Sequence, residues 1–323
     1  MIVNSESGRG AFLCSCIISI AAVAACGDNT AMTGACRSDA DCPSGGACTD
    51  GQCRTIVNAD LSMDDLGPAE MDLAGPPMHD SGVITGDALA ALCSFNGDGV
   101  ISRAEAPFLV GLSAVYAVNA TGSTATVDVQ MHNGAWDFSA AQSGDSKSLD
   151  ELIDPTGQWW SAKFPNATYA SLLSDGQTNL GVYQATSTQL LLLGIVSETS
   201  GLSQTELVYT TPIPVLEFPL SVGQKWSATS ALTGQLQGLI FASQDSYQFS
   251  VDTRGKTLVP AGHFDTLRLR VDVSQAVGFV TTTHIEYLHL AECYGQIARV
   301  QSSDNETSAT FTKAAEYRRL STL

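Results

Sequence analysis

The chain has 323 residues, with 15 Lys and Arg against 33 Asp and Glu, a formal net charge of −18 and nine cysteines. This length permits one large domain or two modest ones with a sizeable buried core. The acidic balance argues against a nucleic-acid-binding protein, because such proteins gain most of their affinity when Lys and Arg neutralise phosphates. Moreover, no apolar stretch reaches the roughly 18–20 residues that a membrane-spanning helix needs.

The first feature along the chain is a short apolar segment, residues 11–25, which follows a polar start that contains Arg9. Its length predicts a signal peptide over residues 1–25. The segment ends in Val-Ala-Ala-Cys26, which resembles the lipobox of bacterial lipoproteins. The resemblance implies that Cys26 is acylated and holds the chain at a membrane of the cell envelope, and Gly27 after it favours the outer membrane. An ordinary secretory signal that contains a cysteine is the alternative.

Six cysteines remain after the two in the signal segment and Cys26 are set aside. Four of them, Cys36, Cys42, Cys48 and Cys53, lie in a stretch of Asp, Ser and Gly within residues 26–58. Such a stretch lacks the hydrophobic residues for a core, so we expect two disulfides to hold it, with three connectivities open. Zinc is the rival interpretation, but paired Cys-x2-Cys knuckles and a nearby His are missing. The module resembles small Cys-rich repeats of myxobacterial envelope lipoproteins.

The last two cysteines, Cys93 and Cys293, are 200 positions apart. They either form a disulfide that ties the start of the folded region to its C-terminal part, or stay as two buried thiols.

Residues 59–84 form an acidic, Pro-containing linker without Lys or Arg. Residues 26–110 together hold 13 acidic and 3 basic residues. Like charges at this density keep a chain extended, so we expect a spacer that holds the folded part away from the membrane.

Residues 85–107 contain a short helical pattern at 87–92 and a loop that resembles an EF-hand calcium loop from Ser94 to Glu105. The resemblance places calcium ligands at Ser94, Asn96, Asp98, the carbonyl of Val100 and Glu105, because calcium prefers oxygen ligands. Ser94 replaces the usual first Asp and Pro107 obstructs the following helix, so any affinity should be weak, with a dissociation constant of roughly 10⁻⁴–10⁻³ M. A turn that binds no metal is the alternative.

From residue 108 to 323 the hydrophobic periodicity changes to two, which is typical of strands. Because the strands follow one another without intervening long helical segments, they predict an antiparallel sandwich or open half-barrel, as one domain or as two subdomains at 108–216 and 217–323. The apolar run 190–196 is interpreted as a buried central strand. The expected strands are 112–119, 124–130, 180–186, 189–198, 206–211, 225–232, 236–243, 247–253, 267–273, 280–290, 297–302 and 309–318.

Three segments of the second half resemble, in order, parts of a group of bacterial envelope domains. They are FPLSVGQKW at 218–226, VPAGHFDTL at 259–267 and YGQIARV at 294–300. That group includes TapB-like domains of unknown function, whose folds look like the half-barrels of the LolA and LolB lipoprotein carriers. The resemblance implies a concave sheet that accepts an acyl chain or a peptide, and a sheet with a filled core is the alternative.

Motifs for catalysis are missing: the sequence contains no G-x-S-x-G elbow, H-E-x-x-H pair, phosphate loop or Rossmann glycine pattern. His284, Glu286 and His289 form the densest titratable cluster, but a strand would place His289 on the opposite face, and we expect an exposed strand face there. Trp159 and Trp160, with Phe164 and Tyr169, are expected to anchor a loop rather than to bind a sugar.

These patterns favour a non-enzymatic, lipid-anchored envelope protein with a binding or structural role, for example toward an envelope protein partner. A half-barrel carrier of a hydrophobic ligand or lipoprotein acyl chain is the second hypothesis. A glycan hydrolase that uses His284 or His289 is the third.

Overall fold

The computed structural model describes the backbone of two short strands near residue 50 and, with side chains, residues 93, 95–119, 125–174 and 179–322. The chain divides into two compact units, one over Val23–Asp80 and one that joins Met1–Ala22 with Ser81–Leu323. In the described part, no helix has the length and apolar character that a bilayer span requires.

In the smaller unit, the described residues form one hairpin. β1 (Gly46–Thr49) pairs antiparallel with β2 (Gln52–Thr55), and Cys48 lies opposite Cys53 in the backbone register. The acylation site predicted at Cys26, the other module cysteines Cys36 and Cys42, the linker and the helical pattern at 87–92 fall outside the described residues. Acylation and the disulfides of the module therefore stay predictions.

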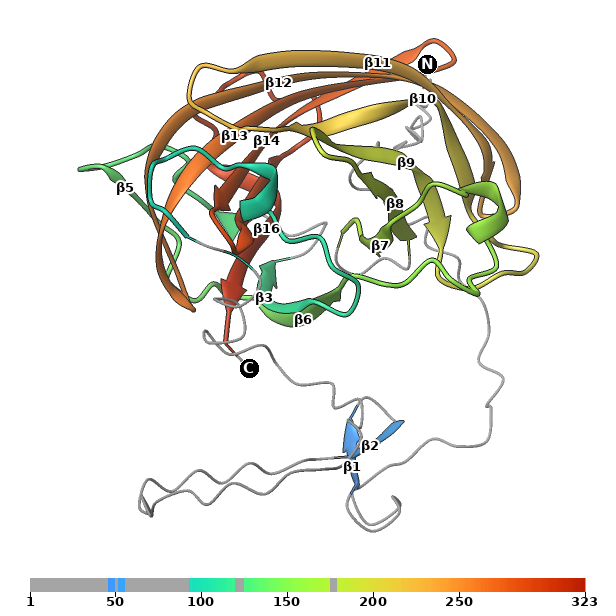
Figure 1. Cartoon of the computed structure of the whole chain (residues 1–323), viewed down its shortest axis with the longest axis horizontal. Helices are drawn as coiled ribbons and strands as arrows, with labels where there is room; N and C mark the ends of the chain where they lie inside the picture. Colours follow the sequence, from blue (N-terminus) through green and yellow to red (C-terminus); the bar gives the residue numbers. More distant parts are fainter. Residues whose placement is uncertain are drawn as a thin grey trace, which may run out of the picture. The chain divides into compact units, whose positions relative to one another are not determined.

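The larger unit contains a single 14-stranded sheet (Figure 1), in the order β6-β3-β16-β15-β14-β13-β12-β11-β10-β9-β8-β7, with β4 beside β16 and β5 beside β12. All of these strands pair antiparallel except β5, which runs parallel to β12. The strands of 108–216 and 217–323 thus share one sheet, because β3 and β6 follow β16. The bounds are β3 (Ser113–Asn119), β4 (Ala125–Thr126), β5 (Ala135–Asp137), β6 (Ser146–Glu151), β7 (Tyr169–Leu172), β8 (Asn179–Ala185), β9 (Gln189–Ser197), β10 (Glu206–Glu217), β11 (Lys225–Leu236), β12 (Leu239–Val259), β13 (Gly262–Val277), β14 (Val280–Ala291), β15 (Gly295–Ser302) and β16 (Lys313–Ser321), with 3-10 helices η2 (Arg103–Glu105) and η3 (Ser161–Lys163).

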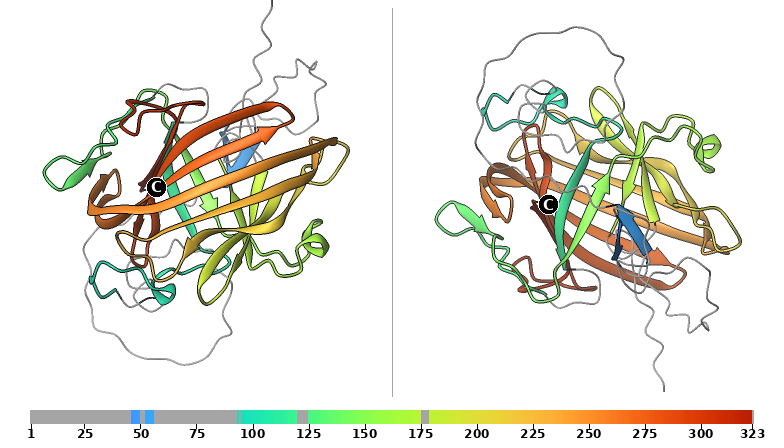
Figure 2. Two further views of the ribbon diagram at one scale, coloured as in Figure 1. Left: turned by 90° about the horizontal axis from the view of Figure 1, so that it is seen from above. Right: turned by 90° about the horizontal axis from the view of Figure 1, so that it is seen from below.

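The sheet curls until its two terminal strands, β6 and β7, approach each other (Figures 1 and 2). Ile153, just after β6, and Ala170 in β7 exchange two backbone hydrogen bonds of 2.7 and 3.0 Å. Register shifts interrupt the pairing of β8 with β9, β9 with β10, β12 with β13, β14 with β15 and β15 with β16. Such bulges bend strands and increase their twist. The predicted antiparallel half-barrel is therefore confirmed, nearly closed, and the sandwich alternative is not formed.

Several strand predictions need correction: β5, β6 and β7 were not predicted, and the strand expected at 309–318 begins only at Lys313. Residues 239–243 and 247–253, expected in separate strands, belong to the single 21-residue strand β12, because the backbone keeps its pairing through the polar residues 244–246. Leu236, the first residue of the expected strand 236–243, ends β11 instead. The expected strand 124–130 is shortened to β4, although Val127 and Val129 are buried. These two valines pack against the sheet without extending it.

The run 190–196 is a buried central strand, as predicted. β9 lies between β8 and β10, and nearly all of its residues are buried. Gly194 is required there, because a Cβ at this position would clash with the Leu207 carbonyl and the Phe164 ring. The resulting close approach packs η3 and its neighbours against this part of the sheet.

Two large hydrophobic clusters lie on opposite faces of the sheet. The concave cluster includes Leu192, Phe249 and Val271. The convex cluster includes Trp136, Phe138 and Tyr287, and is contributed partly by the segment around β5. As a result, β14 is buried on both faces, which places its polar residues in the interior.

Candidate functional site

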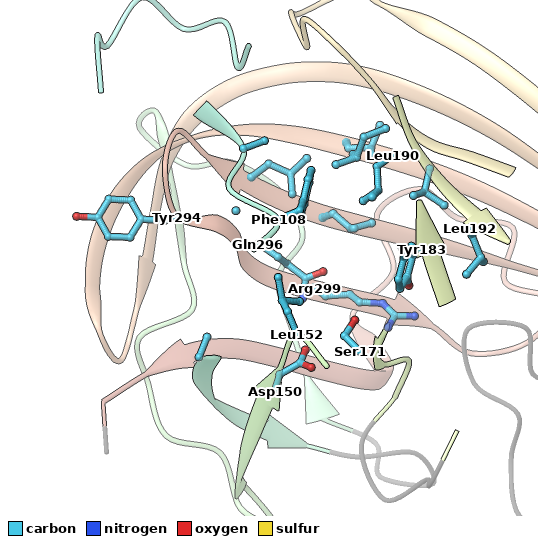
Figure 3. A pocket seen from close by; sticks show the side chains of 18 of the residues that line it. Phe108, Asp150, Leu152, Ser171, Tyr183, Leu190, Leu192, Tyr294, Gln296 and Arg299 are labelled. Carbon is cyan, nitrogen blue, oxygen red and sulfur yellow. The ribbon is translucent and has the colours of Figure 1, made fainter. Parts of the chain in front are cut away.

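The concave face of the half-barrel encloses a cavity of about 290 Å³ (Figure 3). This volume lies close to the lower end of the range for small-molecule sites, roughly 300–1,000 Å³. The walls are mainly apolar because the inward positions of β8 to β14 carry Leu, Val and aromatic residues. They include Leu190, Leu192, Phe249, Leu269, Val271 and Leu288.

One wall is a strap, defined as residues 95–112, which is tied to three turns of the sheet. Its Glu105 carbonyl accepts a 2.7 Å hydrogen bond from the amide of Cys293, after β14. Its Ile101 forms a two-bonded bridge with Leu220, between β10 and β11. Its Arg103 donates from Nε to the carbonyl of Thr186, between β8 and β9, at 2.9 Å. These ties hold the strap as part of the cavity wall.

Phe108 is the strap's aromatic contribution to the cavity (Figure 3). Its ring stacks on Tyr169 with centroids 5.8 Å apart and lies 6.2 Å from Phe218. The guanidinium of Arg103 lies 5.2 Å from the centroid of the same ring. This packing orders the apolar wall on the strap side.

A buried ion pair lies at the polar end of the cavity. Arg299 Nε is 3.3 Å from Glu286 Oε2, and His284 Nε2 is 2.9 Å from Glu286 Oε1. Arg299 also donates to the carbonyl of Leu173 at 2.7 Å. Burial raises the pKa of the Glu286 carboxyl, but the charge of Arg299 and the His284 hydrogen bond outweigh it and hold this pKa below its usual value. Glu286 is therefore an anion that Arg299 neutralises.

A second cation at this end is also paired. Arg318 Nη1 lies 2.9 Å from Asp150 Oδ2, and both residues line the cavity. The buried Glu316 lies 3.6 Å from Arg299 and 3.7 Å from Arg318, and accepts a hydrogen bond from Ser174. Two guanidinium groups thus face three carboxylates, so this end of the cavity carries no surplus of positive charge.

The histidine cluster on β14 is buried, so the predicted exposed strand face is wrong. His284, Glu286 and His289 are 4%, 1% and 1% exposed. The prediction fails because the convex cluster covers His289, while His284 and Glu286 lie on the concave face, inside the half-barrel. His289 lies on the convex face, with Nδ1 2.8 Å from Thr257 Oγ1 and its ring 4.6 Å from Trp136. Burial lowers the pKa of His289 well below its usual value, and the two histidines do not meet.

A further buried carboxyl lies on β12. Asp245 accepts hydrogen bonds from Tyr209 at 3.0 Å and from Ser243 at 2.8 Å, and Gln275 donates to it at 3.3 Å. The Tyr209 hydroxyl is 2.8 Å from that of Tyr247, which lines the cavity. Burial raises the pKa of Asp245 to about 6. These hydrogen bonds satisfy the buried carboxyl of Asp245, so β12 continues through its polar residues without a break.

The EF-hand-like loop forms tight turns. The Asn96 side chain accepts from the amide of Asp98 at 2.8 Å, and the Asp98 side chain accepts from the amide of Val100 at 2.7 Å. Glu105 is buried and accepts from the amide of Ser102 at 2.9 Å. The first predicted ligand, Ser94, lies outside the described residues.

A carboxylate from the turn between β14 and β15 occupies this loop. Glu292 accepts hydrogen bonds from the amides of Asn96 at 3.2 Å, Gly97 at 2.8 Å and Gly99 at 3.4 Å. A side chain at Gly99 would clash with Arg254, which donates to the Gly97 carbonyl at 3.3 Å. Within the described residues, no group of three or more His, Cys, Asp or Glu is arranged to hold a metal. Calcium binding therefore stays a prediction.

The disulfide alternative for the last two cysteines is confirmed. Cys93 and Cys293 form a disulfide with Cα atoms 5.6 Å apart, directly beside Glu292. The expected loop anchors Trp160 and Phe164 are buried, whereas Tyr169, expected with them, begins strand β7 and lines the cavity instead. Trp159 is partly buried and donates to the Ser197 carbonyl at 3.1 Å.

Sequence reasoning missed the paired charges of the cavity. Glu286 and Arg299 each interrupt an apolar stretch at positions whose neighbours are buried, in HIEYLHLA and GQIARV. A charge at such a position signals a buried partner. The partner itself could not be identified, because it depends on which strands pair.

No family model matches the chain, and no curated protein matches it. Among solved structures, the chain is similar to the crystal structure of a "putative lipoprotein" from Parabacteroides distasonis. The identity is 9% and the TM-score 0.34, over 66% of this chain and 96% of that one.

Proposed function

We propose that this chain is a lipid-anchored envelope protein whose half-barrel binds the apolar chain of a small amphiphile, without catalysis. The observation that carries the proposal is the cavity of about 290 Å³, which has apolar walls and a paired polar end. The lipobox-like sequence before Cys26 supports the anchor, and Gly27, in place of an Asp that would signal inner-membrane retention, favours the outer membrane.

The size of the cavity fits one chain rather than several. A methylene group occupies roughly the volume of a liquid water molecule, about 30 Å³. A cavity of about 290 Å³ therefore accepts at least about ten chain atoms. A lipid with two or three acyl chains would have to leave most of its apolar surface outside.

The polar end selects an uncharged head group. Arg299 and Arg318 each have a carboxylate partner within 3.3 Å, in Glu286 and Asp150. A ligand carboxylate or phosphate would be buried without a free counter-charge, which costs several kcal/mol. Hydroxyl, ester and amide groups carry no such cost and can hydrogen-bond to Ser171 or Gln296, which also line the cavity.

Calorimetric titration of the full chain with 1-decanoylglycerol and with decanoate at pH 7.5 tests both the binding of an apolar chain and the preference for an uncharged head group. We expect the ester to bind at least tenfold more tightly than the carboxylate, with a negative heat-capacity change from apolar burial. Equal or tighter binding of decanoate would contradict the head-group assignment. Absence of heat with both ligands would contradict the proposal itself.

Variants locate the binding site. Val271→Phe and Leu192→Phe add bulk inside the cavity and should weaken ester binding at least tenfold. Val222→Phe makes the same type of change at an exposed turn and should leave binding unchanged. Thermal melting checks that each variant is folded.

A further inference from the structure

Two neighbouring hairpins of the sheet end in exposed apolar residues. In the β11–β12 hairpin, Leu239 is 74% exposed and Ile240 is fully exposed. In the β13–β14 hairpin, Phe279 is fully exposed and Val280 is 54% exposed. Burial of such side chains is the usual outcome in a folded protein, so a cluster left in solvent marks a surface with a partner.

The register places both tips at the same end of the sheet (Figure 2). Leu236 pairs with Leu239 at one tip, and Val277 pairs with Val280 at the other. Because β12 pairs with both β11 and β13, the two hairpins run side by side. Leu202, fully exposed, belongs to the same end, because the amide of Gly238 donates to the carbonyl of nearby Gln204 at 2.9 Å.

The three segments that carry these apolar residues contain no charged residue, although Asp304 and Glu306 flank Asn305, which hydrogen-bonds with Thr283 in the neighbouring loop. Residues 199–205, 233–244 and 273–283 lack Asp, Glu, Lys and Arg, in a chain that is 15% charged. An acidic chain of net charge −18 is not drawn to anionic head groups by electrostatics. Uncharged hairpin tips are the part that can approach a bilayer without burying a charge.

We propose that the tips of the β11–β12 and β13–β14 hairpins dock on a lipid surface by inserting Leu239, Ile240 and Phe279. Each of these side chains favours insertion, because burial of a large apolar side chain removes its surface from water. Separate protruding tips fit a fluid bilayer, which adapts to them, whereas a protein partner would need a matched pocket for each tip. Docking of the tips does not require a ligand in the cavity.

The predicted anchor is compatible with this orientation. Residues 27–92 lie between Cys26 and the disulfide at Cys93, a stretch of 66 residues. At about 3.3 Å per residue, even the 37 residues after the β1–β2 hairpin, 56–92, would span roughly 120 Å if extended. The tips can therefore reach the same membrane in which the anchor would be held.

Tryptophan quenching by brominated lipids tests the proposal on the full chain mixed with phosphatidylcholine vesicles. Phe279→Trp places a reporter at the tip, and Leu149→Trp places one at an apolar position on β6 that is 58% exposed. After subtraction of the wild-type signal, brominated lipid should reduce the emission of the Phe279→Trp reporter at least twofold, in low and in high salt. The Leu149→Trp signal should stay within about a tenth of its value.

Three results would overturn the proposal. One is a Phe279→Trp chain that sediments with the vesicles but is not quenched. Another is a chain that stays in the supernatant. The third is a blue shift of the tip reporter that appears without vesicles and grows with protein concentration, because a second copy of the chain would then cover the tips.

Discussion

Arg299 lies 3.3 Å from Glu286 at the polar end of the cavity, and both side chains are buried. The pair comes from neighbouring strands, β14 and β15, and lies at one end of a cavity whose other walls are mainly apolar. The pair leaves the polar end of the cavity without a net charge from these two residues, but still polar. It therefore affects both the stability of the half-barrel and the type of ligand that the cavity can bind.

Glu286→Gln tests the stabilising role of this pair. It leaves Arg299 buried without its nearest charge partner, which should lower the free energy of unfolding by about 3 kcal/mol. Urea unfolding measures this loss. The double variant Glu286→Gln/Arg299→Met should lose less than the two single variants together, because it removes both charges.

Lys163→Gln is the matched control for a surface pair. Lys163 lies 3.5 Å from Glu206, with its side chain 52% exposed. Its loss should cost less than about 1 kcal/mol. If both substitutions cost the same, the buried pair has no special role.

The Cys93–Cys293 disulfide closes a loop of 200 residues. Constraining so long a loop in the unfolded chain stabilises the fold by about 5 kcal/mol in the chain-entropy model. Cys93→Ala/Cys293→Ala should therefore unfold at a clearly lower urea concentration than the oxidised wild-type chain. Adding reductant to both proteins distinguishes the effect of this disulfide from that of the predicted module disulfides. If reductant destabilises the double variant as much as the wild-type chain, the Cys93–Cys293 disulfide contributes little to stability.

Asp245 predicts a specific pH dependence. Burial raises its pKa from 3.8 to about 6, so the folded state binds the proton more tightly than the unfolded state does. Stability associated with Asp245 is fully present below about pH 4 and is lost as the pH rises through about 6, by up to about 3 kcal/mol. The stability of Asp245→Asn relative to the wild-type chain should therefore increase between pH 4 and 7. A difference that stays constant across this range contradicts the assignment.

Calcium binding by the loop at Asn96, Asp98, Val100 and Glu105 is tested by thermal melting. With a dissociation constant of roughly 10⁻⁴–10⁻³ M, about 10 mM calcium should stabilise the chain by about 1.4–2.7 kcal/mol relative to chelator. Glu105→Gln should remove this increase. An unchanged midpoint would favour the metal-free turn, in which Glu292 already satisfies the loop amides.

Local patterns predicted most of the long strands, but not β5, β6 or β7 and not which strands pair. Alternation in LRLRVDV identified β13, and the uninterrupted apolar run identified β9 as buried on both faces. These strands were predictable because side-chain period and burial are local properties of a sheet.

The buried polar residues depended on long-range packing. His289 is covered by Trp136 and Phe138, which come from a segment that contains only the three-residue strand β5. The residues next to His289 in the sequence do not indicate that these aromatic side chains cover it. The sequence therefore predicted that the outer face of β14 is exposed. For the same reason, the pairing of Glu286 with Arg299 required knowledge of the strand order.

Native mass spectrometry of the purified full chain tests the central claim most directly, that the half-barrel holds one small amphiphile. After incubation with 1-decanoylglycerol, the wild-type chain should carry the added mass of one ligand, and Val271→Phe should carry none. A wild-type chain that stays ligand-free under these conditions, or binding that is equal in both proteins, would contradict the account.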